Sequence, residues 1–222
     1  MRRLAEDVYQ LQGFPANAIN VFVVGDVIVD AGTRHAAGRI LRQVRGRAVS
    51  AHVLTHAHPD HQGSTHELCD TLAIPLWCGE LEAPAAEDPA MMRTEKPAST
   101  LDRLIDRVWT GPGHPVARRL TEGDEVAGFT VLHTPGHTIG HIALWRESDR
   151  VLIAGDVLNG MHLATGRPGL HEPPAAFSVD PARNRESARR LAELRPSLIC
   201  FGHGPALRSP EALGTFAAAL PA

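Results

Sequence analysis

The sequence predicts an α/β sandwich, in which two β-sheets pack face to face and helices cover their outer sides. Three observations predict this class. Runs of β-branched and other apolar residues occur in two blocks of the chain, and each block is followed by helical segments. The chain has 222 residues, which suits one large domain. Its composition, 43% apolar and 21% charged, is that of an ordinary globular protein. The order of the strands does not follow from these patterns.

The first block begins with a hairpin. Residues 19–32 (INVFVVGDVIVDAG) contain two β-branched runs separated by Gly25-Asp26, a pair typical of a tight turn. Residues 47–56 (RAVSAHVLTH) are predicted to form a further strand, which ends in a histidine-rich motif. A helix is expected to begin at a capping box, Ser64–Glu67, and to end at about Leu72. A short strand, PLWCG, follows.

A less regular stretch separates the two blocks. Residues 80–97 show no clear period, and we expect a loop or a surface helix that could overhang a site. Residues 100–108 (TLDRLIDRV) are predicted to be helical, and the TGPGHP sequence after Arg107 and Val108 ends that helix.

The second block is a series of strands followed by two helices. Residues 120–137 and 142–156 contain apolar strands joined by EGDE and ESDR turns, and residues 159–179 form a long excursion rich in Gly and Pro. Residues 181–196 are predicted to form an amphipathic helix bounded by two prolines. A last strand, SLICF, runs into GHG, and residues 209–220 form the closing helix.

The motif THAHPDH, at residues 55–61, places three histidines and one aspartate in seven positions. His56 and His58 lie two residues apart, so their rings project to the same side of an extended segment. Asp60 and His61 follow Pro59, where the chain turns, so they can face a second ion. Imidazole and carboxylate groups suit zinc, and also manganese or iron. The motif therefore predicts one half of a metal site.

Three more residues of ligand type follow strands. His137 comes after FTVLH, Asp156 after VLIAG and His203 after SLICF, each near a glycine that permits a close or strained backbone. A carboxylate such as Asp156 can bridge two cations, and two ions held in this way can activate a hydroxide and polarise the substrate. The alternative interpretation is that these side chains are ordinary polar loop residues that bind no metal. The coincidence of four motifs favours a dinuclear metal site.

The motifs HAHPDH, TPGHT, AGD and GHG, in this order and at these separations, resemble the metallo-β-lactamase-fold superfamily. The resemblance runs from VDAGT (residues 29–33) to GHG (residues 202–204), nearly the whole chain. It implies an αββα sandwich of two mixed sheets, a single domain over residues 1–222, and a site at one edge between the sheets. It also implies the metal ligands: His56, His58 and His137 for the first metal, Asp60, His61 and His203 for the second, with Asp156 bridging.

The resemblance implies a hydrolase of an activated acyl substrate: a thioester, an ester or a lactone. A metal-bridging hydroxide would attack the carbonyl carbon, and Asp60 would orient it or carry its proton, which makes Asp60 the expected catalytic residue. The expected cofactors are two divalent ions, zinc in the first place, with iron or manganese open. Glyoxalase II-like enzymes share this ligand set. Because the chain ends 19 residues after His203, we expect it to lack their helical glutathione-binding domain.

Other functions on this fold stay open. A persulfide dioxygenase would use a single iron held by two histidines and an aspartate, whereas the presence of Asp60, His61 and His203 favours two metals. Lactonases of this fold use a tyrosine beside the metals, and the only tyrosine here is Tyr9. A β-lactamase is less expected because those enzymes generally lack the bridging aspartate. A phosphodiesterase and a non-catalytic metal-binding module are further alternatives.

The remaining polar candidates are expected to play supporting parts. His133 and His141 should pack beside the site or support a ligand, and Asp30 should hold backbone or a ligand by hydrogen bonds. His52 is expected to face the sheet. The other histidines named here, His35, His66 and His114, are predicted to be surface or loop residues.

Charge and cysteine content limit the partners and the compartment. A net charge of −3 gives no basic footprint for nucleic acid or an anionic membrane. Three cysteines without a C-x-x-C spacing favour a reducing cytoplasm over a disulfide framework. The N-terminus has no signal-peptide pattern, and no apolar window is long enough to span a membrane. We expect a cytoplasmic protein with a small-molecule substrate; a homodimer is compatible with the sequence.

Overall fold

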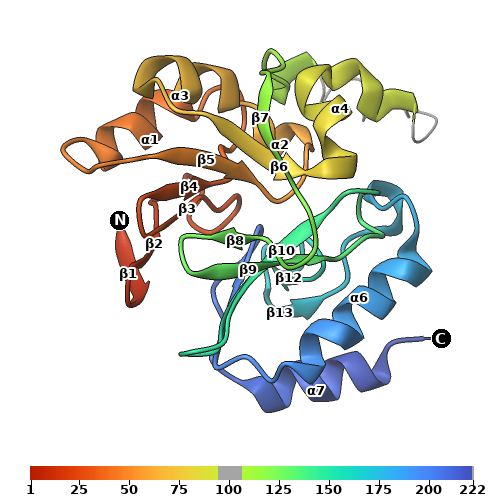
Figure 1. Ribbon diagram of the computed structural model, residues 1–222. Coiled ribbons are helices and arrows are strands. Elements are labelled where there is room, and N and C mark those ends of the chain that lie inside the picture. The colour runs from red at the N-terminus through yellow and green to blue at the C-terminus, as the bar shows by residue number, and fades with distance from the viewer. Residues whose placement is uncertain (95–106, 222) are drawn as a thin grey trace. The chain divides into compact units, whose positions relative to one another are not determined.

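Figure 1 shows the structure, a computed structural model that describes residues 1–94 and 107–221. The chain divides into two compact units. The first comprises residues 1–13 and 19–120, and the second comprises residues 14–18 and 121–222. The short segment 14–18 thus belongs to the second unit, although strands of the first unit precede and follow it. A single domain over residues 1–222 stays a prediction.

The first unit contains a mixed sheet of seven strands in the order β1-β2-β3-β4-β5-β6-β7. The strands from β1 to β4 pair antiparallel, and those from β4 to β7 pair parallel. The predicted hairpin around Gly25 and Asp26 is confirmed. The strands are β1 (Arg2–Ala5), β2 (Val8–Gln10), β3 (Phe22–Val24), β4 (Val27–Val29), β5 (Ala51–Leu54), β6 (Leu76–Gly79) and β7 (Val116–Leu120).

Two helices, α1 (Ala37–Val44) and α3 (Thr65–Leu72), cover one face of this sheet (Figure 1). Ile40 of α1 and Leu68 of α3 are fully buried in one apolar cluster with Ile28 of β4. Burial of these side chains supplies the main driving force that holds the two helices on the sheet. The other helical segments of the first unit are α2 (Pro59–Gln62), η1 (Glu80–Glu82), α4 (Ala83–Glu87) and η2 (Pro89–Thr94).

The second unit contains a five-stranded sheet in the order β14-β11-β10-β9-β8, in which only β11 and β14 pair parallel among the described strands. Its strands and those of a separate hairpin are β8 (Glu125–Val126), β9 (Phe129–His133), β10 (Ile142–Arg146), β11 (Val151–Gly155), β14 (Leu198–Phe201), and β12 (Asn159–Met161) with β13 (Pro168–His171). A short helix, η3 (Ala175–Phe177), follows the hairpin.

The helices α6 (Pro181–Glu193) and α7 (Pro210–Ala219) lie side by side in the second unit (Figure 1). Leu191 and Leu213 pack in one buried cluster with Trp145 of the sheet. Both helices begin as their sequences predict: a proline stands in the first turn, and the side chain before it accepts a backbone N–H, Asp180 at α6 and Ser209 at α7. Among the described residues, no helix combines the length and apolar character needed to cross a bilayer.

Two mixed sheets with their helices confirm the predicted fold class. Several elements were not predicted, among them the β1–β2 hairpin, helices α1 and α2, strand β7, and the β12–β13 hairpin inside the Gly/Pro-rich excursion. The predicted helix over 100–108 lies outside the described residues as far as residue 106. The predicted capping box is wrong, because the Ser64 hydroxyl donates to the carbonyl of Thr33 and accepts the N–H of Ala36 instead of capping α3.

The parallel pairing brings functional side chains to one edge of each sheet. In the first unit, the carboxyl ends of β4, β5 and β6 lead into Asp30, His56 and Glu82 respectively. In the second unit, β11 and β14 run parallel and lead into Asp156 and His203. Loops at the carboxyl ends of parallel strands are the usual place for ligand-binding groups in α/β proteins.

The buried ring of His52, in β5, makes the stability of the first unit depend on pH. Its Nδ1 lies 3.1 Å from the carbonyl oxygen of Ile28, and its Nε2 lies 2.9 Å from the hydroxyl of Thr65. A neutral ring satisfies both contacts, with Nδ1–H donating and Nε2 accepting. Burial lowers the pKa of His52 from 6.5 to about 4.

We expect wild-type protein to lose stability through His52 as the pH falls from 6.5 towards 4. In this range the unfolded chain binds a proton on His52 and the folded chain does not, so folding is weakened by roughly 3 kcal/mol at the low end. The measurement is the free energy of unfolding from thermal melts of chelator-treated wild type and His52→Gln at several pH values. The amount by which the wild type is more stable than the variant should shrink as the pH falls from 6.5 towards 4. The exposed variant His35→Gln serves as the control. Parallel pH profiles for wild type and His52→Gln would contradict the prediction.

Candidate metal centre

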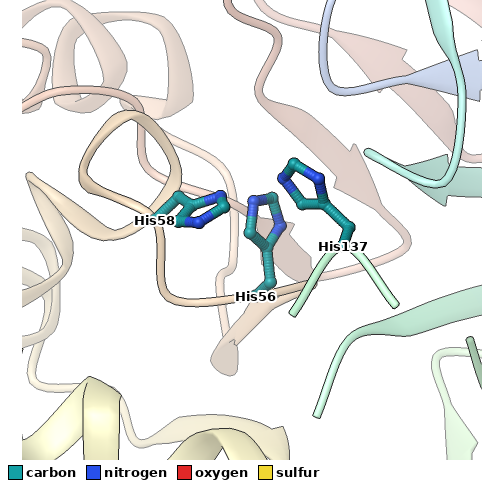
Figure 2. Close-up of side chains that lie close together, drawn as sticks. All are labelled: His56, His58 and His137. Atoms are coloured by element: carbon teal, nitrogen blue, oxygen red, sulfur yellow. The ribbon is translucent and has the colours of Figure 1, made fainter. Parts of the chain in front are cut away.

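The histidine-rich motif of the first unit lies where β5 ends and α2 begins. His56 is buried in the turn after β5, and His58 stands at the N-cap of α2. Pro59 opens the helix, and Asp60 and His61 occupy its first turn. The ring centroids of His56 and His58 lie 4.7 Å apart, and Figure 2 shows these two rings; its third ring, His137, belongs to the second unit and is described with it below. His56 and His61 are closer still, at 4.1 Å.

Asp30 organises this motif from the neighbouring strand. It follows β4, has a positive φ of 61°, and is 1% exposed. One carboxylate oxygen accepts the backbone N–H of Thr55 at 2.8 Å, and the other lies 2.9 Å from Nδ1 of His61. The Thr55 hydroxyl lies within 3.1 Å of both carboxylate oxygens. The expectation that Asp30 holds backbone or a ligand by hydrogen bonds is confirmed.

These contacts decide which ring nitrogens carry protons. A carboxylate only accepts, so His61 donates from Nδ1–H, and its lone pair lies on Nε2. The Thr55 hydroxyl donates to Asp30, so the Nδ1 of His56, 3.0 Å away, donates to that hydroxyl. His56 therefore also carries its lone pair on Nε2. Such outer partners of histidine fix the tautomer that binds metal.

Glu82 is a functional residue that the sequence analysis missed. Its side chain is 1% exposed, and one carboxylate oxygen accepts the backbone N–H of Ala57 at 2.7 Å. Two buried carboxylates, Asp30 and Glu82, thus hold the backbone on both sides of His56. The sequence stretch 80–97 gave no signal of this, because a lone glutamate in an irregular segment looks like a surface residue.

The second unit holds Asp156 by a similar device. Its backbone N–H donates to Nε2 of His141 at 3.0 Å, so Nδ1 of His141 carries the proton and donates to the hydroxyl of Thr134, 2.8 Å away. Both histidine and threonine are fully buried. The expected supporting part of His141 is confirmed. His133, at the end of β9, instead donates its backbone N–H to Glu122 on the surface.

The Asp156 carboxylate lies between two histidines of its own unit. Its Oδ2 is 3.1 Å from Nε2 of His203 and 3.6 Å from Nε2 of His137. His203 donates its Nδ1–H to the carbonyl of Ala18, and Nδ1 of His137 lies 3.3 Å from the hydroxyl of Ser178. With Nδ1–H committed to a carbonyl, Nε2 of His203 presents a lone pair to a carboxylate. That arrangement requires a proton or a cation between them.

Two glycines allow this close packing. Gly136, before His137, has φ 131°, and a Cβ there would lie 2.1 Å from the backbone nitrogen of Asn184. Gly204, after His203, has φ 97°, and a Cβ there would lie 2.2 Å from the carbonyl carbon of Gly160. No other residue fits either position without a backbone shift. The sequence prediction that glycines beside the ligands serve close approach is thereby confirmed at these two positions.

The donor set fits metal. All seven predicted residues carry imidazole or carboxylate groups, which are the ligands of zinc, manganese and iron. Two atoms that share one tetrahedral zinc at 2.0–2.1 Å lie about 3.3 Å apart. The distances from Asp156 to His203 and to His137, 3.1 and 3.6 Å, bracket this value. The structure brings together four of the predicted ligands in the first unit and three in the second: His56, His58, Asp60 and His61, and His137, Asp156 and His203.

Comparisons with known proteins identify a family, relatives and structural neighbours of the chain. The family described as the metallo-beta-lactamase superfamily matches residues 15–203. A probable metallo-hydrolase of Bacillus subtilis (strain 168), YflN, is 30% identical over 200 residues, which cover 80% of this chain and 75% of that protein. A hydroxyacylglutathione hydrolase of Bdellovibrio bacteriovorus is 29% identical over 193 residues, covering 82% of this chain and 61% of that protein. The solved structure of TTHA1623 in a di-iron-bound form has a TM-score of 0.64 and 28% identity, covering 99% of this chain and 98% of that one.

We expect Asp30→Asn to weaken metal binding by about 10- to 100-fold. The variant's amide can still accept from Thr55, but its NH₂ group then faces Nδ1 of His61. That contact favours the tautomer with the proton on Nε2, which cannot bind metal. Competition with a chromophoric chelator measures the affinity. Asp26→Asn, in the exposed β3–β4 turn, is the matched control. An affinity of Asp30→Asn equal to that of the control would contradict the prediction.

Proposed function

The chain belongs to the metallo-β-lactamase superfamily, its relatives mark it as a metallo-hydrolase, and we propose that it uses two metal ions to hydrolyse an activated acyl bond, in the first place a thioester. The observation that carries the proposal is the Asp156 carboxylate, which lies at ligand spacing from His137 and His203. A carboxylate can be shared by two cations. The hydroxyacylglutathione hydrolase relative supports a thioester as the substrate class.

We assign the ligands as follows in this proposal. His56, His58 and His137 would hold one ion, Asp60, His61 and His203 would hold the other, and Asp156 would be a ligand of both. The donor types suit zinc first, and the di-iron-bound neighbour makes iron the second metal to test. When bound, the ions supply Lewis acidity and a nucleophile generated from water at neutral pH.

The chain's own residues orient the ligands and handle the proton. Asp30 and Thr55 keep the rings of His61 and His56 in the metal-binding tautomer. In thioester hydrolysis a C–O bond forms, the C–S bond breaks, and one proton of the attacking water must reach the leaving thiolate. Asp60, half-buried in the first turn of α2, is the carboxylate that we propose takes up this proton.

A dinuclear centre predicts about two metal ions per chain in the purified wild-type protein. We expect Asp156→Ala to lose most of this metal, because it removes the shared ligand. Asp26→Ala, an exposed aspartate of the first unit, should keep it. Elemental mass spectrometry measures the content. One iron per chain, with oxygen uptake on a persulfide, would overturn the proposal in favour of a dioxygenase.

A thioester substrate predicts thiol release that depends on the bound metal. We expect the Asp156→Ala variant to lose about 100-fold or more in kcat/KM. Even the loss of a residue that only hydrogen-bonds to a metal ligand costs about 10- to 100-fold in activity. Release of free thiol from a series of acyl thioesters, detected with a thiol reagent, gives the rates. Ester, lactone and β-lactam substrates are run in parallel. Metal-loaded protein that cleaves a β-lactam but no thioester would contradict the substrate class.

A further inference from the structure

Three side chains of the first unit form a cluster that the hydrolytic function does not use. His66 and Asp70 lie one turn apart on α3, and His114 lies in the stretch that leads into β7. The sequence alone placed His66 and His114 as surface or loop residues. In the structure His66 and His114 are half-buried, and Asp70 is exposed.

The two imidazoles face each other through the same ring atom. Nδ1 of His66 lies 3.2 Å from Nδ1 of His114, and the ring planes are inclined at 63°. One ligand atom from each of the three residues lies within 4.8 Å of the others. A shared tetrahedral zinc would place two ring nitrogens about 3.3 Å apart. The observed distance between the Nδ1 atoms fits two ligands of one ion.

Asp70 is placed to complete the set. Its Oδ2 lies 3.4 Å from Nε2 of His66, longer than a normal hydrogen bond, so the contact does not lock the carboxylate. The side chain of Asp70 is 63% exposed, which leaves it room to change rotamer. Residues four apart on a helix project to the same side. A change of rotamer at Asp70 is the movement that would bring a carboxylate oxygen to an ion held by the two rings, and one ligand atom of each of the three residues already lies within 4.8 Å of the others.

We propose that His66, Asp70 and His114 bind a zinc ion at a second site, separate from the ligands of the hydrolytic centre. Two imidazoles and one carboxylate are a zinc donor set, and water can fill the remaining position. Desolvation by burial, and then the neighbouring His66, lower the pKa of His114. A lowered pKa favours the neutral ring of His114, which is the form that binds metal.

Such an ion would fasten the stretch before β7 to α3. The same stretch already contacts two segments near the histidine-rich motif. The Trp109 carbonyl accepts the N–H of Arg34, in the loop after β4, and a Cβ at Gly111 would lie 1.9 Å from the carbonyl oxygen of Gly63. Gly63 directly follows α2, the helix of Asp60 and His61. The zinc would therefore hold in place the stretch before β7, which packs against the end of α2. Because it binds the folded protein, it would also stabilise that protein by mass action.

Equilibrium dialysis against Zn²⁺ of the wild-type protein and four variants tests the proposal. We expect one zinc equivalent that is lost in His114→Asn and in His66→Asn but kept in Asp156→Ala, which removes only the hydrolytic centre. His35→Asn, an exposed histidine of the same unit, should keep it as well. The hydrolytic ions are counted separately by their loss in Asp156→Ala, so failure of one site does not mimic failure of the other.

A second readout is thermal. Zn²⁺ should raise the Tm of Asp156→Ala, and this rise should vanish when His114→Asn is added to that variant. Folding of each variant is checked by its melt without metal. Equal zinc content in wild type and His114→Asn, or no zinc-dependent shift in Asp156→Ala, would overturn the proposal.

Discussion

The carboxylate of Asp30, almost fully buried at the ends of two parallel strands, is the constraint on which the metal-binding motif depends. A buried charge of this kind costs several kcal/mol unless its partners compensate it. Here the partners are the backbone and hydroxyl of Thr55 and the ring of His61. Because all of them must donate, one carboxylate fixes the backbone of the motif, the rotamer of Thr55 and the tautomers of two histidines that we propose as ligands. Glu82 repeats the device one strand further along, at Ala57.

In the second unit, neutral groups hold the backbone of Asp156 in place. His141 holds the backbone of Asp156 and is itself held by Thr134, so no buried charge is needed behind the ligand. In the first unit the four proposed ligands all follow β5, and in the second unit the proposed ligands Asp156 and His203 follow β11 and β14, which run parallel. The residues that hydrogen-bond to the proposed ligands lie in the same unit as those ligands. The β12–β13 hairpin carries none of the proposed ligands.

The sequence allowed much of this arrangement to be predicted. Long apolar strands that end in His, Asp or Gly signal both a strand and a candidate ligand, and α6 and α7 carry their caps and prolines in the sequence. The strands β1 (RRLA) and β2 (VYQ) lack the β-branched runs that marked β3 and β4, and α1 lacks a capping hydrogen bond to mark its start. Ser64 shows the limit of local rules, because its hydroxyl bonds to residues 28 and 31 positions away rather than to its own helix. Glu82 and the His66–His114 pair were missed for the same reason: each depends on a partner distant in sequence.

The segment 14–18, which belongs to the second unit, sets the order in which the molecule can be completed. The carbonyls of Asn17 and Ala18 accept hydrogen bonds from Gly204 and from the ring of His203, 185 residues further along the chain. A growing chain makes this segment 185 residues before its partner His203 and must keep it available until that partner has been made. Closing so large a loop is slow compared with local pairing. His203, the last of the proposed ligands along the sequence, therefore acquires its tautomer only after both ends of this loop have been synthesised and have met, and the set of proposed ligands cannot be complete before then.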